Sequence, residues 1–153
     1  MLRISRLTDY GTVVLAHLAR DDAELVSAAE VATATGIALP TVSKLLKLLA
    51  KVGIVTSTRG SHGGYRLARD AHAISAADVI DALDGPVSIT ECSAADSQCD
   101  FEAHCNVGSA WQRINVAIRR ALDEISLADL LRATGPVPRF EFAGLPITIE
   151  VKR

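Results

Sequence analysis

Three observations predict a mainly α-helical fold with one small β-hairpin. Apolar residues recur every three or four positions over most of the chain, which is typical of amphipathic helices. One β-branched stretch, residues 54–58, precedes a turn with three glycines, which indicates a hairpin. The 153 residues are 49% hydrophobic and 22% charged, which excludes a disordered or collagen-like chain. This length fits one domain, or one domain plus a dimerising arm.

The N-terminal part of the chain predicts two helices. The first covers about residues 8–20, where apolar side chains lie at helical spacing: Leu7, Tyr10, Val13, Val14, His17 and Leu18. Ser27 and Glu30 have the spacing of a capping box, in which each side chain binds the other residue's backbone N–H. They predict the start of a short second helix, which Gly36 ends.

A third helix is predicted after Pro40, which suits a first helical turn, and it ends at Gly53. Its apolar stripe consists of Val42, Leu45, Leu46, Leu49 and Val52. Two short helices, the second with a basic outer face, are typical of a helix-turn-helix motif, although an ordinary helical hairpin gives the same pattern. The candidate residues for contact with bases in the major groove are Thr41, Ser43, Lys44 and Lys47.

The predicted hairpin directly after this helix would form a wing. Residues 54–58 and 65–67 are its two strands, and 59–64 are its turn. Arginine suits a narrow, negative minor groove, so a wing can add contacts to DNA. The candidate DNA-binding residues of the wing are Arg59, Ser61, His62 and Tyr65. A phosphate-binding loop of the nucleotide-binding kind is excluded because no Gly-Lys-Ser or Gly-Lys-Thr follows the glycines.

The distribution of charge supports a polyanion as the partner. Residues 37–66 carry five Lys and Arg and no acid, whereas residues 70–105 carry eight Asp and Glu and no Lys or Arg. The formal net charge of −2 therefore conceals a basic segment followed by an acidic one. A solvated helix face would give the same local excess of lysine, so charge alone leaves both interpretations open.

The second half of the chain predicts a helix from Ser75 to Gly85, a loop with three cysteines and a long helix. Apolar residues of the long helix repeat at alternating fours and threes: Val107, Trp111, Ile114, Ile118, Ala121 or Leu122, and Ile125. Such a seam is typical of helices that pair, and we expect it to join two protomers. A short helix after Ser126 and a tail follow. The alternating residues 147–152 indicate a strand or a loose arm.

The three cysteines are separated by six and five residues. Zinc sites favour pairs two to four residues apart, and ferredoxin runs are tighter still, so neither pattern fits. Wider gaps suit a loop that wraps an iron–sulfur cluster. Three unrelated cysteines or a redox-active pair of thiols remain alternatives.

Taken together, the N-terminal Leu2-Arg3-Ile4-Ser5 with Asp9-Tyr10, the helix-turn-helix, the wing and the cysteine loop resemble one family. It is the Rrf-type family of bacterial winged-helix iron–sulfur regulators, and the first eleven residues are most similar to regulators of the SUF iron–sulfur assembly operon. The resemblance covers about residues 1–133. It implies a homodimer that binds double-stranded operator DNA and carries a 2Fe-2S or 4Fe-4S cluster.

The resemblance also implies the cluster ligands Cys92, Cys99 and Cys105. The IscR branch has a histidine three residues beyond the last cysteine, but here that position is Gly108. The NsrR branch uses an aspartate near the start of helix one, which corresponds to Asp9. We therefore expect Asp9 as the fourth ligand, with His104 or an exogenous ligand as alternatives.

We accordingly expect a winged helix-turn-helix DNA-binding domain over 1–85, a cluster-binding loop over 86–106, a dimerisation region over 107–134 and a tail over 135–153. The predicted function is a cytoplasmic transcriptional regulator, with no membrane partner because no apolar run approaches ~18 residues. A nitric-oxide-sensing repressor is the nearest alternative. A cytoplasmic thiol-redox enzyme is the alternative from another class, although Cys-x-x-Cys is missing.

Overall fold

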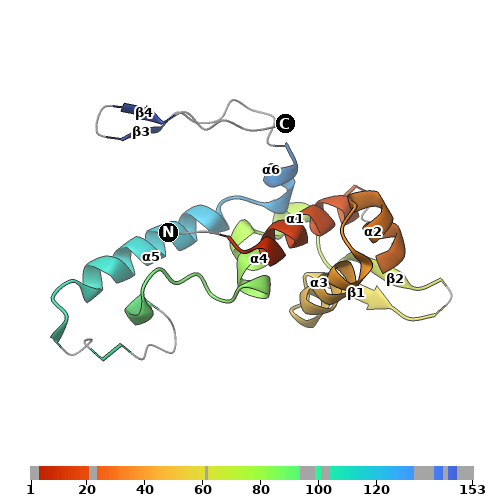
Figure 1. The fold of residues 1–153 in the computed structure, drawn as a ribbon, viewed down its shortest axis with the longest axis horizontal. Helices are drawn as coiled ribbons and strands as arrows, with labels where there is room; N and C mark the ends of the chain where they lie inside the picture. Colours follow the sequence, from red (N-terminus) through yellow and green to blue (C-terminus); the bar gives the residue numbers. More distant parts are fainter. Residues whose placement is uncertain are drawn as a thin grey trace.

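The computed structural model describes residues 4–20, 24–60, 62–93, 99–100, 104–132, 140–142 and 145–147 (Figure 1). The helices are α1 (Arg6–Leu18), α2 (Ala28–Thr35), α3 (Leu39–Lys51), α4 (Ala76–Leu83), α5 (Gly108–Asp123) and α6 (Leu127–Arg132). The strands are β1 (Val55–Thr58), β2 (Gly64–Leu67), β3 (Phe140–Phe142) and β4 (Leu145–Ile147). Two short 3-10 helices are η1 (Ala71–Ala73) and η2 (Glu91–Ser93). The expected fold class, mainly helical with a winged helix-turn-helix and a long extra helix, is confirmed.

Local signals set the ends of the helix-turn-helix elements. Helix α1 begins at Arg6, two residues before the predicted start, because the Ser5 hydroxyl accepts hydrogen bonds from the backbone N–H groups of Leu7 and Thr8. The predicted capping box at the start of α2 is present. Gly36 ends α2 with a φ of 73°, a left-handed conformation that favours glycine.

The wing is an antiparallel pair in which Val55 lies opposite Leu67 and Thr58 lies opposite Gly64. A bridge joins it to the segment before α2, because Val26 and Tyr65 exchange backbone hydrogen bonds of 3.0 and 2.8 Å. The wing is therefore attached to both ends of the helix-turn-helix: it follows α3 directly and pairs with the lead-in to α2.

One hydrophobic core unites α1, α2, α3, the wing and α4. It includes Leu15, Leu45 and Leu49, all fully buried. Leu127 at the start of α6 is also fully buried in this core, and the backbone N–H of Leu127 donates to the Ile74 carbonyl. Helix α6 thus packs with the winged helix, although the sequence grouped it with the dimerisation region.

Helix α1 approaches α4 unusually closely at Gly11. A Cβ atom at Gly11 would overlap the Leu83 side chain of α4. Beside this contact, the Ser5 hydroxyl donates to the Asp84 carboxylate at 2.6 Å. The end of α4 is therefore held against the start of α1.

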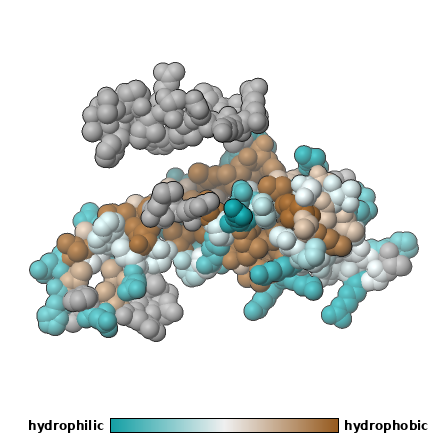
Figure 2. All heavy atoms as spheres, viewed as in Figure 1, coloured by the Kyte–Doolittle hydropathy of each residue, from teal (hydrophilic) through white to brown (hydrophobic). Residues whose placement is uncertain are grey.

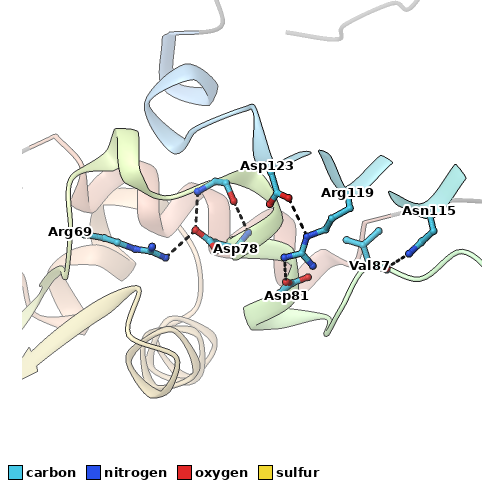
Figure 3. A network of polar contacts seen from close by, with 8 residues as sticks. Arg69, Asp78, Asp81, Val87, Asn115, Arg119 and Asp123 are labelled. Atoms are coloured by element: carbon cyan, nitrogen blue, oxygen red, sulfur yellow. Dashed lines mark hydrogen bonds and ion pairs between the residues drawn. The ribbon is translucent and has the colours of Figure 1, made fainter. Parts of the chain in front are cut away.

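Helix α5 meets α4 and the following loop through polar contacts (Figure 3). The Arg119 guanidinium lies 2.7 Å from the Asp81 carboxylate and 3.5 Å from that of Asp123. The Asn115 side chain donates to the Val87 carbonyl at 3.1 Å and accepts from the Ile89 N–H at 3.3 Å. These contacts fix the direction in which α5 leaves the winged helix.

The tail departs from its prediction. Strands β3 and β4 pair antiparallel, with Phe140 opposite Ile147, so the tail contains a hairpin rather than one strand over 147–152. Residues 148–152 lie outside the described residues. Within the part of the chain that is described, no helix is both long enough and apolar enough to cross a membrane.

Candidate functional site

The outer face of α3 separates cleanly from its buried stripe. Val42, Leu45, Leu46 and Leu49 are fully buried. Lys44 and Lys47 are exposed, whereas Thr41 and Ser43 are half-buried beside them. Lys44, Lys47 and Lys51 line one side of an open groove of about 550 Å³. The four predicted residues of α3 therefore lie along its solvent side, where a recognition helix contacts DNA.

The wing contributes a second set of basic and polar groups. Arg59 and His62 are exposed in its turn, and Ser61 lies outside the described residues. Tyr65 differs from the others, because it is half-buried and packs against the core. Tyr65 therefore contributes to packing, and its contact with DNA stays a prediction. Among the described residues, no carboxylate forms an ion pair with Lys44, Lys47 or Arg59.

The cysteine loop begins and ends against α5. None of the three cysteines is in a disulfide, and each is half-buried. The Cys92 sulfur lies 3.2 Å from the Thr90 hydroxyl, and the Cys92 carbonyl accepts from the Gln112 side chain at 3.4 Å. A Cβ atom at Gly108 would lie 3.5 Å from the Cys105 sulfur. Cys92 and Cys105 thus both lie along the first turns of α5.

Position 108 is informative because the IscR branch has a histidine there. It lies beside the Cys105 sulfur in this structure, so a side chain at this position would be next to a cysteine. Glycine offers no donor atom. The ligand that the IscR branch has at this place is absent from this chain.

The structure does not bring a complete ligand set together in one protomer. Across the described ranges, no three His, Cys, Asp or Glu side chains converge as a metal site requires. The donor chemistry nevertheless fits an iron–sulfur cluster, since three thiols outside disulfides stand on one loop and thiolates are the ligands such clusters use. Part of this loop, residues 94–98 and 101–103, lies outside the described residues.

Asp9 lies apart from the cysteines in this protomer. It is exposed on the first turn of α1 and lines a mostly apolar groove of about 520 Å³ between α1, α4, α5 and α6. No cysteine lines this groove. His104, the alternative fourth ligand, is exposed directly beside Cys105.

The first half of the α5 seam is exposed in the described part of the chain, whereas Ile118 and Leu122 are half-buried. Trp111 is 42% exposed and Ile114 is 44% exposed, and α5 contains no buried residue at all. Figure 2 shows apolar side chains continuing from α5 towards α1 and α6. Both of these helices carry exposed apolar side chains, Val13 in α1 and Leu130 and Leu131 in α6.

Two features of this region could not be found by helical spacing alone. Val13 and Tyr10 follow the apolar pattern of α1 but are exposed, at 43% and 39%. Asn115 lies within the apolar repeat of α5 and anchors the cysteine loop through two hydrogen bonds. A polar amide inside an apolar repeat was the available signal, since such a side chain needs a partner.

Comparisons with known proteins agree with this arrangement. Residues 4–133 match the model of the Rrf2 family, described as iron-dependent transcriptional regulators. The chain is 34% identical over 139 residues to protein rrf2 of Nitratidesulfovibrio vulgaris, covering 90% of this chain and 93% of the relative.

Two solved structures share the fold. CymR, the global cysteine regulator of B. subtilis, has a TM-score of 0.67 at 30% identity and matches 88% of this chain and 100% of its own. IscR of T. potens has a TM-score of 0.63 at 30% identity, with 88% and 89% covered. Rrf2 members are transcriptional regulators and not enzymes, which argues against a thiol-redox enzyme. The chain belongs to the Rrf2 family of winged-helix transcriptional regulators.

Proposed function

We propose that this regulator works as a cytoplasmic homodimer that binds operator DNA, senses iron–sulfur cluster status and controls iron–sulfur assembly genes of the SUF type. The observation that carries the proposal is the cysteine loop. Its three cysteines form no disulfide, and two of them, Cys92 and Cys105, lie along α5, the helix with the exposed apolar residues Trp111 and Ile114. A change at the loop therefore acts directly on the helix expected to join two protomers.

Cys92, Cys99 and Cys105 would hold the cluster, and Asp9 of a second protomer would be the fourth ligand. A bound cluster supplies a group that oxygen, nitric oxide or iron shortage can alter. A carboxylate binds iron less firmly than a thiolate, so Asp9 would be the weakest of the four attachments. The exposed position of Asp9 on α1 supports this assignment.

Anaerobic purification tests the cluster. We expect a brown protein that contains iron and sulfide, and we expect Cys92→Ser and Cys105→Ser to lose both. A colourless wild-type protein that holds zinc would contradict the proposal. Asp9→Ala should keep the fold and the dimer but lose its cluster faster in air. If His104→Ala shows that behaviour instead, His104 is the ligand.

A cluster-free thiol sensor is the second candidate, favoured by the likeness to CymR, a cysteine regulator. It needs the same cysteines but no iron. Operator binding by iron-free protein before and after mild oxidation separates the two. A nitric-oxide sensor would use the same cluster ligands, and it is distinguished by treating the loaded protein anaerobically with nitric oxide and measuring operator affinity.

A further inference from the structure

A polar cavity of about 510 Å³ lies between the start of α2, the middle of α3 and the wing. Its lining includes Lys47 of α3, Ser27 at the N-cap of α2, and Ser57, Thr58 and Arg59 of the wing. With Tyr65, two cationic side chains and four residues with hydroxyl groups therefore line one open space. No acidic side chain contributes to its lining.

Backbone contacts hold the walls of this cavity in place. The bridge between Val26 and Tyr65 ties the wing to the residue just before Ser27. Gly64 packs so closely that a Cβ atom there would come within 2.9 Å of the Val26 backbone. A Cβ atom at Gly63 would overlap the Thr58 carbonyl oxygen. The wing and the start of α2 consequently form one rigid unit around the space.

The charges of the cavity are available to a ligand. Lys47 and Arg59 are exposed and form no ion pair within the described residues. The nearest acid on the same element is Glu30, whose carboxylate accepts the Ser27 backbone N–H at 2.7 Å. The side-chain and backbone hydrogen bonds from Ser27 lower the pKa of Glu30, so it stays ionised in that capping role.

We infer that this cavity binds one phosphate of the DNA backbone, with Lys47 and Arg59 supplying charge and the hydroxyls donating hydrogen bonds. The inference rests on the proposed binding of DNA. If α3 enters a major groove and the wing reaches the adjacent minor groove, the strand between the two grooves must cross the space between α3 and the wing. Lys47 then contacts phosphate, not a base edge as its place in the helix-turn-helix suggested.

The role of Lys47 differs from that of Lys44, one turn earlier on α3. A phosphate contact adds affinity for every sequence and carries no sequence information. Lys47→Gln should therefore weaken binding to operator and to unrelated duplex by the same factor. It should also reduce the log–log salt slope by about 0.9. Lys44→Gln is the matched control, because Lys44 is equally exposed but does not line the cavity.

Methylphosphonate substitution, which removes the charge of a single phosphate, provides the direct test. The duplex is one selected in vitro for tight binding to the wild-type dimer. We expect one position in each half-site where the substitution weakens wild-type binding about tenfold, as loss of a charge-assisted hydrogen bond would. That sensitivity should be reduced in Lys47→Gln and in Ser57→Ala and should persist in full in Lys44→Gln.

The outcomes separate this inference from the proposed function. If the folded wild-type protein selects no duplex, the DNA-binding proposal fails. If it binds but Lys47→Gln retains the full sensitivity at every phosphate, the cavity is not a phosphate site. A change in base preference with Lys47→Gln would equally overturn the inference, since it would show that Lys47 reads bases. Circular dichroism of each variant checks that the fold is unchanged.

Discussion

Helices α3 and α5 are both amphipathic, but only one of them is covered by its own chain. The apolar stripe of α3 is fully buried, from Val42 to Leu49. The seam of α5 leaves Trp111 and Ile114 more than 40% exposed. The same kind of sequence pattern is thus buried within the chain in α3, whereas burial of the α5 seam stays a prediction that needs a second protomer.

The neighbours of the two helices explain the difference. Helix α3 packs against α1, α2, α4 and β1 through apolar side chains, whereas α5 meets α4 and η2. Polar groups, Asn115 and Arg119, make the directed contacts of α5. A helix that its own chain holds through polar contacts can leave its apolar seam free for a second protomer to cover.

The largest expected effect comes from shortening one apolar side chain on each of the two helices. Leu45→Ala should lower the free energy of unfolding by about 2–5 kcal/mol, because it leaves a cavity in a packed core. Ile114→Ala should change the stability of the separated protomer far less, since Ile114 is already exposed there. Urea unfolding at low protein concentration measures both. Equal losses would mean that α5 packs within its own chain.

A charge in the seam should break the dimer. Ile114→Glu would place two carboxylates at the two-fold interface, and we expect monomers with poor operator affinity. Val116→Glu is the matched control, because Val116 is also exposed but points to nearly the opposite side of α5. Sedimentation velocity measures the assembly. A stable, active Ile114→Glu dimer would place the interface elsewhere.

The wing should add affinity without affecting assembly. Arg59→Ala should weaken operator binding and reduce the log–log salt slope by roughly 0.9, as loss of one phosphate contact does. The dimer should persist, since Arg59 lies in the wing and not on α5. Fluorescence anisotropy at several salt concentrations measures the slope. An unchanged slope would remove Arg59 from the interface.

The smallest effect concerns the junction of α1 and α4 in acid. Burial alone would raise the pKa of Asp84, but the Ser5 and Thr8 hydroxyls and the Ser5 backbone N–H outweigh it and lower that pKa. A carboxyl with a lowered pKa stabilises the fold above its unfolded pKa, near 3.8, and this contribution is lost as pH falls through the folded value. Asp84→Asn should therefore lose less stability than wild type between pH 5 and pH 3. Urea unfolding at both values is the measurement, and identical losses would exclude this role.

Local signals made much of the winged helix predictable. The capping boxes at Ser27 and Ser75, the stripe of α3 and the glycines of the wing each depend on residues close in sequence. Long-range contacts were not predictable in this way. Leu127 enters a core whose other buried members all lie far earlier in the chain, from Val14 to Val79, and nothing in α6 itself indicates that destination.

The candidate site also contains features that local sequence predicts and features that depend on long-range contacts. Exposure of Lys44, Lys47 and Arg59 followed from helical and hairpin periodicity, and the structure agrees. The placement of Cys92 and Cys105 along α5 depends on loop geometry, which spacing between cysteines does not determine. Asp9 is the clearest example of a residue whose surroundings the sequence does not predict. Within the chain it lines a mostly apolar groove, whereas its predicted partners, the cysteines, would belong to another protomer.

The contact between α1 and α4 at Gly11 has no room for one more carbon atom while the Leu83 side chain stays in place. Because the Leu83 side chain occupies the place of the missing Cβ, an added methyl group at Gly11 would force that side chain to turn aside. Helix α4 ends at Leu83, and the chain then runs through Gly85 to the cysteine loop. The smallest possible mutation at position 11 would therefore repack the last residue of α4, at the point where the chain leaves for the cysteine loop.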